Sequence, residues 1–359
     1  MLLFDLEIKN SIKNEFLKKS EKLINNKDFI LGKEVKEFEN NFSTFLNTKY
    51  CIGLNSGTDA LELALKSLKL DKTHNVCLPA YSFFSTSEVV LKLGLDPVYV
   101  DINLDDLTID IEDTYNKINK KTRAIIPVHI FGNAANLKEL GSLKNIKIIE
   151  DVAQAFGSKQ NNNYLGSIGD IGCFSFFPTK NLGGFGDGGA VVTNNKEYFE
   201  EIKSLRVHGQ TKRYFHEKVG YNSRLDTIQA IILNLKLKEA DKNIKKRIKN
   251  VKRNIFNFEN NENIKVHIKN PNANSLIPIS ITKGKLSFLK KELEKNNIPY
   301  GNYYPYGLHE FPISKNRNIK LTNVEWATKN VLTLPCGPNI TQKNIDNVCD
   351  VIQVTLDKF

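Results

Sequence analysis

The sequence has few of the features that identify secreted, membrane-spanning or metal-binding proteins. Its five cysteines are odd in number and form no C-x-x-C pair, so neither a disulfide framework nor a zinc site of the usual spacing is indicated. No apolar run is long enough to span a bilayer, and Asp5, Glu7 and Lys9 occupy the place where a signal peptide would have its apolar core. We therefore expect a cytoplasmic protein without a membrane partner and without a metal.

Positive charge is in surplus, but it is not concentrated. The formal net charge is +11, yet the lysines are spread along the chain. In the densest cluster, residues 242–252, apolar residues lie between the lysines, as on a solvated helix face. No helix-turn-helix pattern is present, so a DNA-binding regulator is the disfavoured alternative from another functional class. A nucleotide diphosphate substrate could use part of the surplus.

Apolar strand patterns alternate with helical segments along most of the chain. The strands are expected at residues 50–54, 75–78, 97–101, 122–129, 146–149 and 173–177. This alternation predicts an α/β protein with a mainly parallel, doubly wound sheet. Residues 1–30 are expected to form a helix, because apolar residues recur near helical spacing. We place a large domain at residues 1–240 and a smaller α+β domain at residues 241–359.

The most informative stretch is residues 173–194, where Lys180 follows an apolar strand and precedes a glycine-rich loop and a second strand. A surface lysine is the ordinary interpretation of any single lysine. Three of the glycines fit G-x-G-x-x-G, but a β-branched run follows where a dinucleotide-binding turn would open a helix. The third interpretation is an ε-amine that forms a Schiff base with an aldehyde such as pyridoxal phosphate.

Two other patterns supply what that cofactor requires. A carboxylate must keep its ring nitrogen protonated, and Asp151 follows the strand at residues 146–149, at the sheet edge where ligands bind. A helix cap is the alternative role for this Asp. Residues 55–59 (NSGTD) precede a helical run, so hydroxyl and amide groups are expected at the positive end of a helix, where a phosphate binds. With Lys180, these patterns favour a pyridoxal phosphate site.

Five motifs, in this order, resemble those of a known family. They are residues 56–61 (SGTDAL), 150–155 (EDVAQA), 175–183 (SFFPTKNLG), 186–190 (GDGGA) and 220–226 (GYNSRLD). The chain resembles the DegT/DnrJ/EryC1/StrS sugar aminotransferases over nearly its whole length. The resemblance implies the fold type I architecture of pyridoxal 5'-phosphate (PLP)-dependent transferases, and it is greatest to the dTDP-3-amino-3,6-dideoxyhexose (C3) transaminases.

The resemblance also implies residue roles. Lys180 and Asp151 would be catalytic, and both would contact the cofactor. The further cofactor contacts that it implies are Ser56, Gly57, Thr58, Phe83, Gln154, Ser175 and Asn222. Phe83 fits the ring-stacking aromatic better than Tyr81, although both could be core residues. Asn222 would reach across a homodimer interface to the cofactor phosphate of the neighbour, so that the active sites are shared.

The implied reaction has two halves. L-Glutamate would give its amino group to the cofactor, and a nucleotide-linked keto-sugar would then accept it, with Lys180 moving a proton in each half. Gly-Asp-Gly-Gly after Lys180 resembles the enzymes that act at C3 of dTDP-3-keto-6-deoxyhexoses, in deoxyamino sugar and glycan biosynthesis. The C4 enzymes, which use dTDP- or UDP-4-keto-6-deoxyhexoses, more often carry Gly-Glu-Gly-Gly and are the alternative.

Candidate substrate contacts come from three segments. Residues 210–219 have no clear periodicity and are either a solvent loop or a substrate loop whose cations meet a diphosphate and whose aromatic meets a pyrimidine. The candidates in this loop are Lys212, Arg213, Tyr214 and Phe215. Arg224 belongs to the motif at residues 220–226. His309 matches a Y-P-x-x-x-H segment that approaches the sugar in the resembling family.

Overall fold

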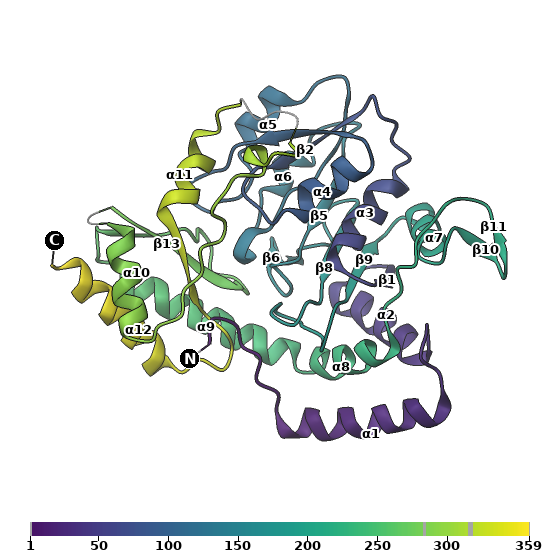
Figure 1. Cartoon of the computed structure of the whole chain (residues 1–359), viewed down its shortest axis with the longest axis horizontal. Helices are drawn as coiled ribbons and strands as arrows, with labels where there is room; N and C mark the ends of the chain where they lie inside the picture. The colour runs from purple at the N-terminus through teal and green to yellow at the C-terminus, as the bar shows by residue number, and fades with distance from the viewer. Residues whose placement is uncertain (1, 283–284, 315–318, 359) are drawn as a thin grey trace.

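A seven-stranded sheet lies at the centre of the computed structural model, which describes residues 2–282, 285–314 and 319–358 (Figure 1). In spatial order the strands are β1 (Tyr50–Leu54), β9 (Gly189–Thr193), β8 (Ile171–Ser175), β5 (Lys147–Asp151), β4 (Thr122–Ile125), β2 (Asn75–Pro79) and β3 (Asp96–Val100). Strand β9 runs antiparallel to both of its neighbours, and the other four pairings are parallel. The prediction of a mainly parallel sheet is confirmed.

Alternation along the strands divides the apolar core between the two faces of the sheet. Ile149 and Cys173 pack on one face, whereas their neighbours Ile148 and Phe174 pack on the other. The first face is covered by α3 (Gly57–Ser67), α4 (Ser85–Lys92) and α7 (Lys196–Leu205). The second face is covered by α2 (Lys33–Leu46), α6 (Leu137–Leu140) and α8 (Thr227–Leu237). When both faces of a sheet are covered, the ends of its strands remain accessible to ligands.

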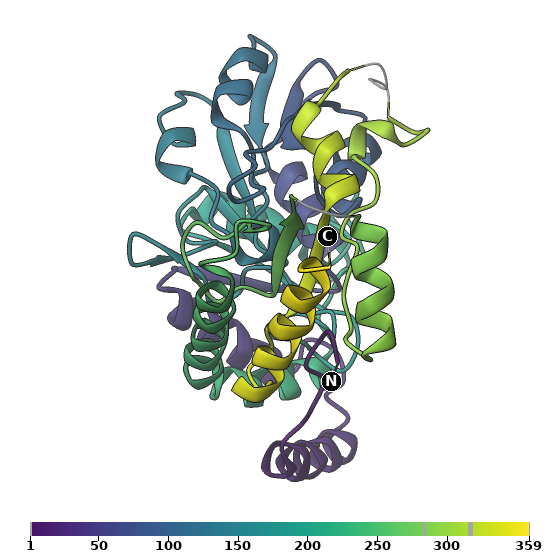
Figure 2. The same ribbon diagram turned by 90° about the vertical axis from the view of Figure 1, so that its left-hand side faces the viewer.

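The N-terminal segment departs from the predicted helix over residues 1–30. Helix α1 begins at Asn10 and ends at Asn26, and residues 2–9 are not helical. Asp5 instead accepts a hydrogen bond from the Asn339 N–H at 3.0 Å, and the Lys9 ammonium pairs with the Glu239 carboxylate. These contacts replace the helical ones that periodicity alone suggested. Helix α1 itself lies at the periphery of the molecule, where it packs on α8 (Figures 1 and 2).

A second, smaller core lies on the C-terminal side. Its antiparallel sheet contains β12 (Ile264–Val266), β13 (Leu276–Ile281) and β14 (Val331–Pro335). Helices α9 (Ala240–Phe258), α12 (Gln342–Leu356) and α10 (Leu286–Lys295) pack around it, and Figure 2 shows them in a row. The boundary between residues 240 and 241 stays a prediction.

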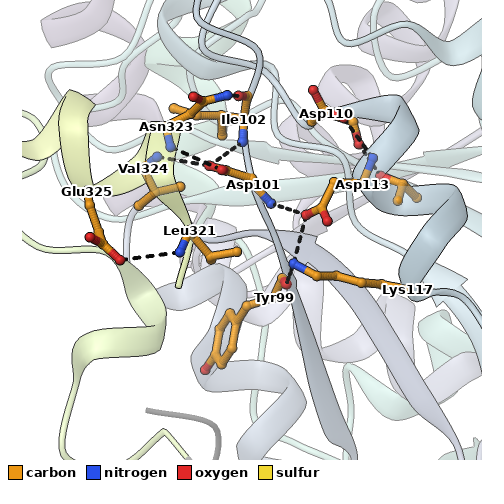
Figure 3. Close-up of polar contacts among 11 residues, drawn as sticks. Tyr99, Asp101, Ile102, Asp110, Asp113, Lys117, Leu321, Asn323, Val324 and Glu325 are labelled. Carbon is orange, nitrogen blue, oxygen red and sulfur yellow. Dashed lines mark hydrogen bonds and ion pairs between the residues drawn. The ribbon is translucent and has the colours of Figure 1, made fainter. Parts of the chain in front are cut away.

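Helix α11 (Thr322–Asn330) returns from the C-terminal part to the large sheet, where Asp101 receives it (Figure 3). The Asp101 carboxylate accepts hydrogen bonds from the N–H groups of Asn323 at 3.0 Å and Val324 at 2.9 Å. It therefore caps the N-terminus of α11 from the end of β3. The Asp113 carboxylate accepts the Asp101 N–H at 2.7 Å and so anchors the cap to α5 (Ile111–Lys117).

The remaining elements are short. They are η1 (Ile130–Gly132), η2 (Leu308–Glu310), β6 (Lys159–Gln160), β7 (Asn163–Tyr164), β10 (Gln210–Lys212) and β11 (Phe215–His216). Strands β10 and β11 form a hairpin that projects from the body beside α7 (Figure 1). Across the three described ranges, every helix is too short or too polar to cross a membrane.

Candidate active site

Lys180 and Asp151 lie near each other at the carboxyl ends of two neighbouring parallel strands. Asp151 is the last residue of β5 and pairs in register with Cys173 of β8, and Lys180 lies in the turn that follows β8. Burial lowers the pKa of Lys180 below its usual 10.5, while the Asp151 carboxylate acts in the opposite direction. A larger fraction of this amine is therefore neutral at a given pH than for an exposed lysine.

The Asp151 side chain is 5% exposed and is fixed by two donors. The Thr86 hydroxyl donates to Oδ2 at 3.0 Å, and the Ala153 N–H donates to Oδ1 at 3.1 Å. Burial raises the pKa of this carboxyl, and the two hydrogen bonds and the nearby Lys180 reduce the rise. The site thus holds an oriented, poorly solvated carboxylate that a cationic ligand group would stabilise.

The neighbouring Glu150 has a structural role on the other side of the strand. It accepts the N–H groups of Gly166, Ile168 and Gly169 at 2.6, 2.9 and 2.6 Å. His129 Nε2 lies 3.0 Å from the same carboxylate, and both side chains are fully buried. The Ala135 N–H donates to His129 Nδ1 at 3.2 Å, which leaves the proton on Nε2 to bond Glu150. His129 is therefore a structural residue of this loop.

The motif at residues 56–61 forms the start of α3 beside the end of β8. Ser56 is the N-cap, and its Oγ accepts the Asp59 N–H at 3.0 Å. A Cβ at Gly57 would lie 2.7 Å from the Ser175 Cβ, and the Thr58 hydroxyl lies 2.8 Å from that of Ser85. The first N–H groups of a helix have no acceptor within it. The first turn of α3 thus packs against Ser175 with no room for a side chain at position 57, and its N–H groups lie beside several hydroxyls.

An aromatic pair lies near Asp151 and Gln154. Phe83 is 59% exposed, and its ring centroid lies 6.4 Å from that of Tyr304. The Gln154 amide donates to the Tyr304 hydroxyl at 2.9 Å, and burial, with a smaller effect of Asp151, raises the pKa of Tyr304. Tyr81, the second candidate for the stacking aromatic, is 1% exposed and belongs to the core.

Sequence reasoning missed Thr86 and Tyr304. Thr86 lies in the first turn of α4, one turn beyond Phe83, and that spacing could have indicated it. Tyr304 is the tyrosine of the Y-P-x-x-x-H segment that ends at His309, but that pattern does not associate it with Asp151 or Gln154.

The glycines after Lys180 approach protein groups. A Cβ at Gly183 would lie 2.3 Å from the Pro178 oxygen, and one at Gly184 would lie 2.8 Å from Gln229 Oε1. A Cβ at Gly189 would lie 2.2 Å from the Ser56 oxygen. The G-x-G-x-x-G interpretation is therefore wrong, because β9 follows in place of a helix and the glycines serve internal packing.

The other candidates do not join this cluster within one chain. The proposed substrate loop is the projecting hairpin, whose tip carries Tyr214, 79% exposed, and Phe215, 57% exposed (Figure 1). Lys212 and Arg213 are exposed on the same hairpin. Asn222 is exposed and Arg224 is half-buried in the segment before α8.

His309 is not accessible in this chain. Its side chain is 2% exposed, its ring centroid lies 6.4 Å from that of Tyr99, and its Nδ1 has no hydrogen-bond partner. Burial lowers its pKa, and nearby carboxylates oppose the shift. A contact between His309 and a sugar stays a prediction.

The family model that describes the DegT/DnrJ/EryC1/StrS aminotransferase family matches residues 10–353. The chain is 33% identical to a pleiotropic regulatory protein of Geobacillus stearothermophilus, over 95% of this chain and 94% of that one. It is 31% identical to UDP-2-acetamido-2-deoxy-3-oxo-D-glucuronate aminotransferase of Pseudomonas aeruginosa, over 96% and 98%. It is also 31% identical to dTDP-3-amino-3,4,6-trideoxy-alpha-D-glucose transaminase of Streptomyces venezuelae, over 90% and 88%.

Solved structures have the same fold. A DegT/DnrJ/EryC1/StrS aminotransferase from Brucella abortus superposes with a TM-score of 0.93 at 30% identity and covers 99% of each chain. NtdA from Bacillus subtilis, solved with its cofactor PMP (pyridoxamine phosphate), superposes with a TM-score of 0.92 at 28% identity, over 99% of this chain and 85% of that one. The expected PLP-transferase architecture is confirmed.

Proposed function

Because the chain belongs to the DegT/DnrJ/EryC1/StrS aminotransferase family, we propose that it moves the amino group of L-glutamate to C3 of a dTDP-3-keto-6-deoxyhexose. That it is an aminotransferase of nucleotide-linked keto-sugars follows from the family and its relatives. The observation that carries the chemistry is a half-buried Lys180 amine close enough to the oriented Asp151 carboxylate for each group to shift the other's pKa.

The position of the amine is supported by two relatives of different nucleotide type. The Pseudomonas relative is named for a 3-oxo sugar linked to UDP, and the Streptomyces relative for a 3-amino sugar linked to dTDP. Their names agree on C3 and differ in the nucleotide. Gly186-Asp187-Gly188-Gly189 supports the dTDP-linked C3 group by resemblance. The C4 ketones remain the alternative substrates.

The residues present fit PLP. The start of α3 at Gly57, where the backbone approaches Ser175 closely, suits a phosphate, because helix N-termini bind anions. The Asp151 carboxylate suits a protonated ring nitrogen, and Lys180 suits an aldehyde. Phe83 presents an exposed ring that could cover one face of the cofactor. When bound, PLP withdraws electrons from the α-carbon of an attached amino acid.

Each residue would then have a distinct task. The Lys180 Nζ, once free, accepts a proton from the donor α-carbon and delivers a proton in the second half-reaction. The Asp151 carboxylate holds the proton on the ring nitrogen, and Thr86 and Ala153 keep the carboxylate oriented. Gln154 and Tyr304 form a hydrogen-bonded pair next to Phe83.

We further propose a homodimer in which Asn222 and the β10–β11 hairpin complete the neighbour's site. Asn222 is exposed, and Tyr214 and Phe215 are large aromatics left in solvent. The same chain also exposes Phe83, and it exposes Phe177 and Phe185 on either side of Lys180 in the sequence. Apolar side chains at a site opening and on a projecting hairpin are typical of surfaces that meet a partner. A cytoplasmic location accords with five buried, free thiols.

An absorbance titration tests the function. Excess glutamate should bleach the long-wavelength band of the PLP-loaded enzyme, and a dTDP-3-keto-6-deoxyhexose, added after removal of glutamate, should restore it. Restoration only by a UDP-linked 3-keto sugar or by a 4-keto sugar would overturn the proposed substrate. Lys180→Arg is the control, and it should stay folded without any response, because a guanidinium stays protonated.

The regulator alternative has a separate test. Binding to duplex DNA that falls steeply between low and high salt would support it. The relative from Geobacillus is named as a regulatory protein, so this measurement belongs beside the titration. We expect no such binding, since no recognition helix was identified in the sequence.

A further inference from the structure

The glycine-rich loop after Lys180 is held from behind by one face of α8. The Gln229 Oε1 accepts the Phe185 N–H at 2.8 Å. Seven residues later, which is two helical turns and the same face, the Lys236 ammonium donates to the Gly183 oxygen at 2.5 Å. Both contacts reach main-chain atoms of the loop, so they act on the backbone and not on a variable side chain.

The fit between the loop and α8 is close. A Cβ at Gly184 would lie 2.8 Å from Gln229 Oε1, and one at Gly186 would lie 2.9 Å from Gln229 Nε2. The Phe185 ring packs edge-on against Phe16 of α1, with centroids 4.8 Å apart. The Lys236 ammonium also lies 5.5 Å from the Phe185 ring centroid. The glycines therefore let the loop lie directly on this helix face.

The Lys236 ammonium loses solvation where it contacts the loop. Burial lowers its pKa to about 8, and the Asp5 carboxylate opposes the shift. The other charged residues around the cavity behind the Lys180 turn are Glu7, Lys9, Lys180, Glu239 and Arg247. The acceptor found for Lys236 in the described residues is the neutral Gly183 oxygen. A hydrogen bond from a cation to a carbonyl is stronger than one between neutral groups.

The contacts of Gln229 and Lys236 restrain the loop that follows Lys180. Lys180 lies three residues before Gly183, and Asn181 between them donates to the Ala273 oxygen at 2.7 Å. A glycine-rich segment loses more conformational freedom on ordering than any other, so without fixed partners it would let the Lys180 main chain shift. Reactions that depend on a near-attack geometry are sensitive to displacements of about 1 Å.

We propose that Gln229 and Lys236 are positioning residues that clamp residues 183–185 on α8 and thereby fix the backbone from which Lys180 projects. The inference rests on the proposed role of Lys180 as the amine that captures PLP. It assigns no contact with substrate or cofactor to either residue. It predicts that loosening the clamp slows the capture of PLP while the rest of the fold is retained.

The test compares matched variants of the full-length enzyme. Lys236→Met removes the ammonium and keeps an unbranched chain, and Lys238→Met is its control at an exposed position of the same helix end. Gln229→Leu removes the acceptor, and Gln229→Glu restores it. The rate of PLP capture at Lys180 is measured by borohydride quenching and peptide mass spectrometry, and deuterium uptake is followed over residues 181–188.

We expect Lys236→Met and Gln229→Leu to slow capture about tenfold and to raise deuterium uptake in this segment, because each loses one loop hydrogen bond. Lys238→Met and Gln229→Glu should stay within about twofold of the unaltered enzyme. Faster uptake with unchanged capture, or unchanged uptake, would overturn the clamp. If Lys236→Met loses its fold, the Gln229 pair decides. Absence of capture at Lys180 in the unaltered enzyme would instead refute the proposed function.

Discussion

The two groups at the centre of the site shift each other's ionisation, and burial shifts both toward their neutral forms. The pKa of Lys180 is lowered and that of Asp151 is raised. A neutral amine is the form that attacks an aldehyde, so the shift at Lys180 favours capture of the cofactor near neutral pH. The raised pKa of Asp151 is unfavourable for its proposed role, because that role needs the charged carboxylate. A bound, protonated ring would supply the missing partner charge.

This contrast leads to a prediction for Asp151→Asn. In the cofactor-free enzyme the folded pKa of Asp151 lies above 3.8, so the folded state binds more protons than the unfolded state between the two pKa values. The corresponding stability is present at low pH and is lost as pH rises through the folded pKa. Each unit of such a shift is worth about 1.4 kcal/mol.

We therefore expect Asp151→Asn, free of cofactor, to lose less stability than the unaltered chain when pH rises from 4 to 8. Denaturant unfolding at both pH values measures the difference, and Asp187→Asn, at an exposed position, is the control. Asp151→Asn should also bind PLP but lose most of its turnover, since an amide cannot hold the ring proton. Equal pH dependence, or near-normal turnover, would contradict the assignment.

At the scale of elements, the Asp101 cap joins two distant parts of the chain. It ties α11 to the end of β3, and α11 places Val324 and Ala327 in the core of the large sheet. Asp101→Ala should lower the free energy of unfolding by about 1–2 kcal/mol, because the N–H groups that it accepts lose their partner. Asp96→Ala, at the exposed other end of β3, should change it by less than about 0.5 kcal/mol.

The β10–β11 hairpin projects from the body of its own chain, and its proposed role is to meet a ligand. Arg213 lies over the Tyr214 ring at 5.2 Å, which presents a cation and an aromatic together at the tip. If the tip meets the nucleotide of the sugar substrate, Tyr214→Ala should raise the KM for the sugar about tenfold, the usual value of a stacked base, and leave that for glutamate unchanged. Steady-state kinetics with each substrate varied separately checks this, with Val219→Ala as the control.

At the scale of the whole molecule, the proposed sharing of active sites between two chains can be tested by complementation. Lys180→Arg and Asn222→Ala chains should each form homodimers with little or no activity. A mixed dimer would contain one site with both Lys180 and the neighbour's Asn222 intact. Activity should therefore appear after the two variants are dissociated and reassociated together. No gain over the separate variants would show that Asn222 acts within its own chain or has no role in the site.

Much of the fold could be predicted from local patterns. Strands at residues 50–54 and 75–78 are confirmed as β1 and β2, since buried apolar runs between turn residues leave few alternatives. The prediction of a helix over residues 1–30 was wrong for its first part, because the hydrogen bond of Asp5 with Asn339 is a tertiary contact that local periodicity does not record. The hairpin at residues 210–216 lacked periodicity, because it is exposed on both faces.

The sequence by itself determined the fold class and the family, and it predicted the residues around which the candidate site is proposed. Lys180, Asp151 and the turn at residues 55–59 follow from strand ends and a helix start, which are local properties. Only the tertiary structure decided the partners that tune them. Thr86 and Tyr304 reach Asp151 and Gln154 from other elements, and Gln229 and Lys236 hold the loop from α8. These contacts depend on how separate elements pack, and no short-range pattern in the chain records that packing.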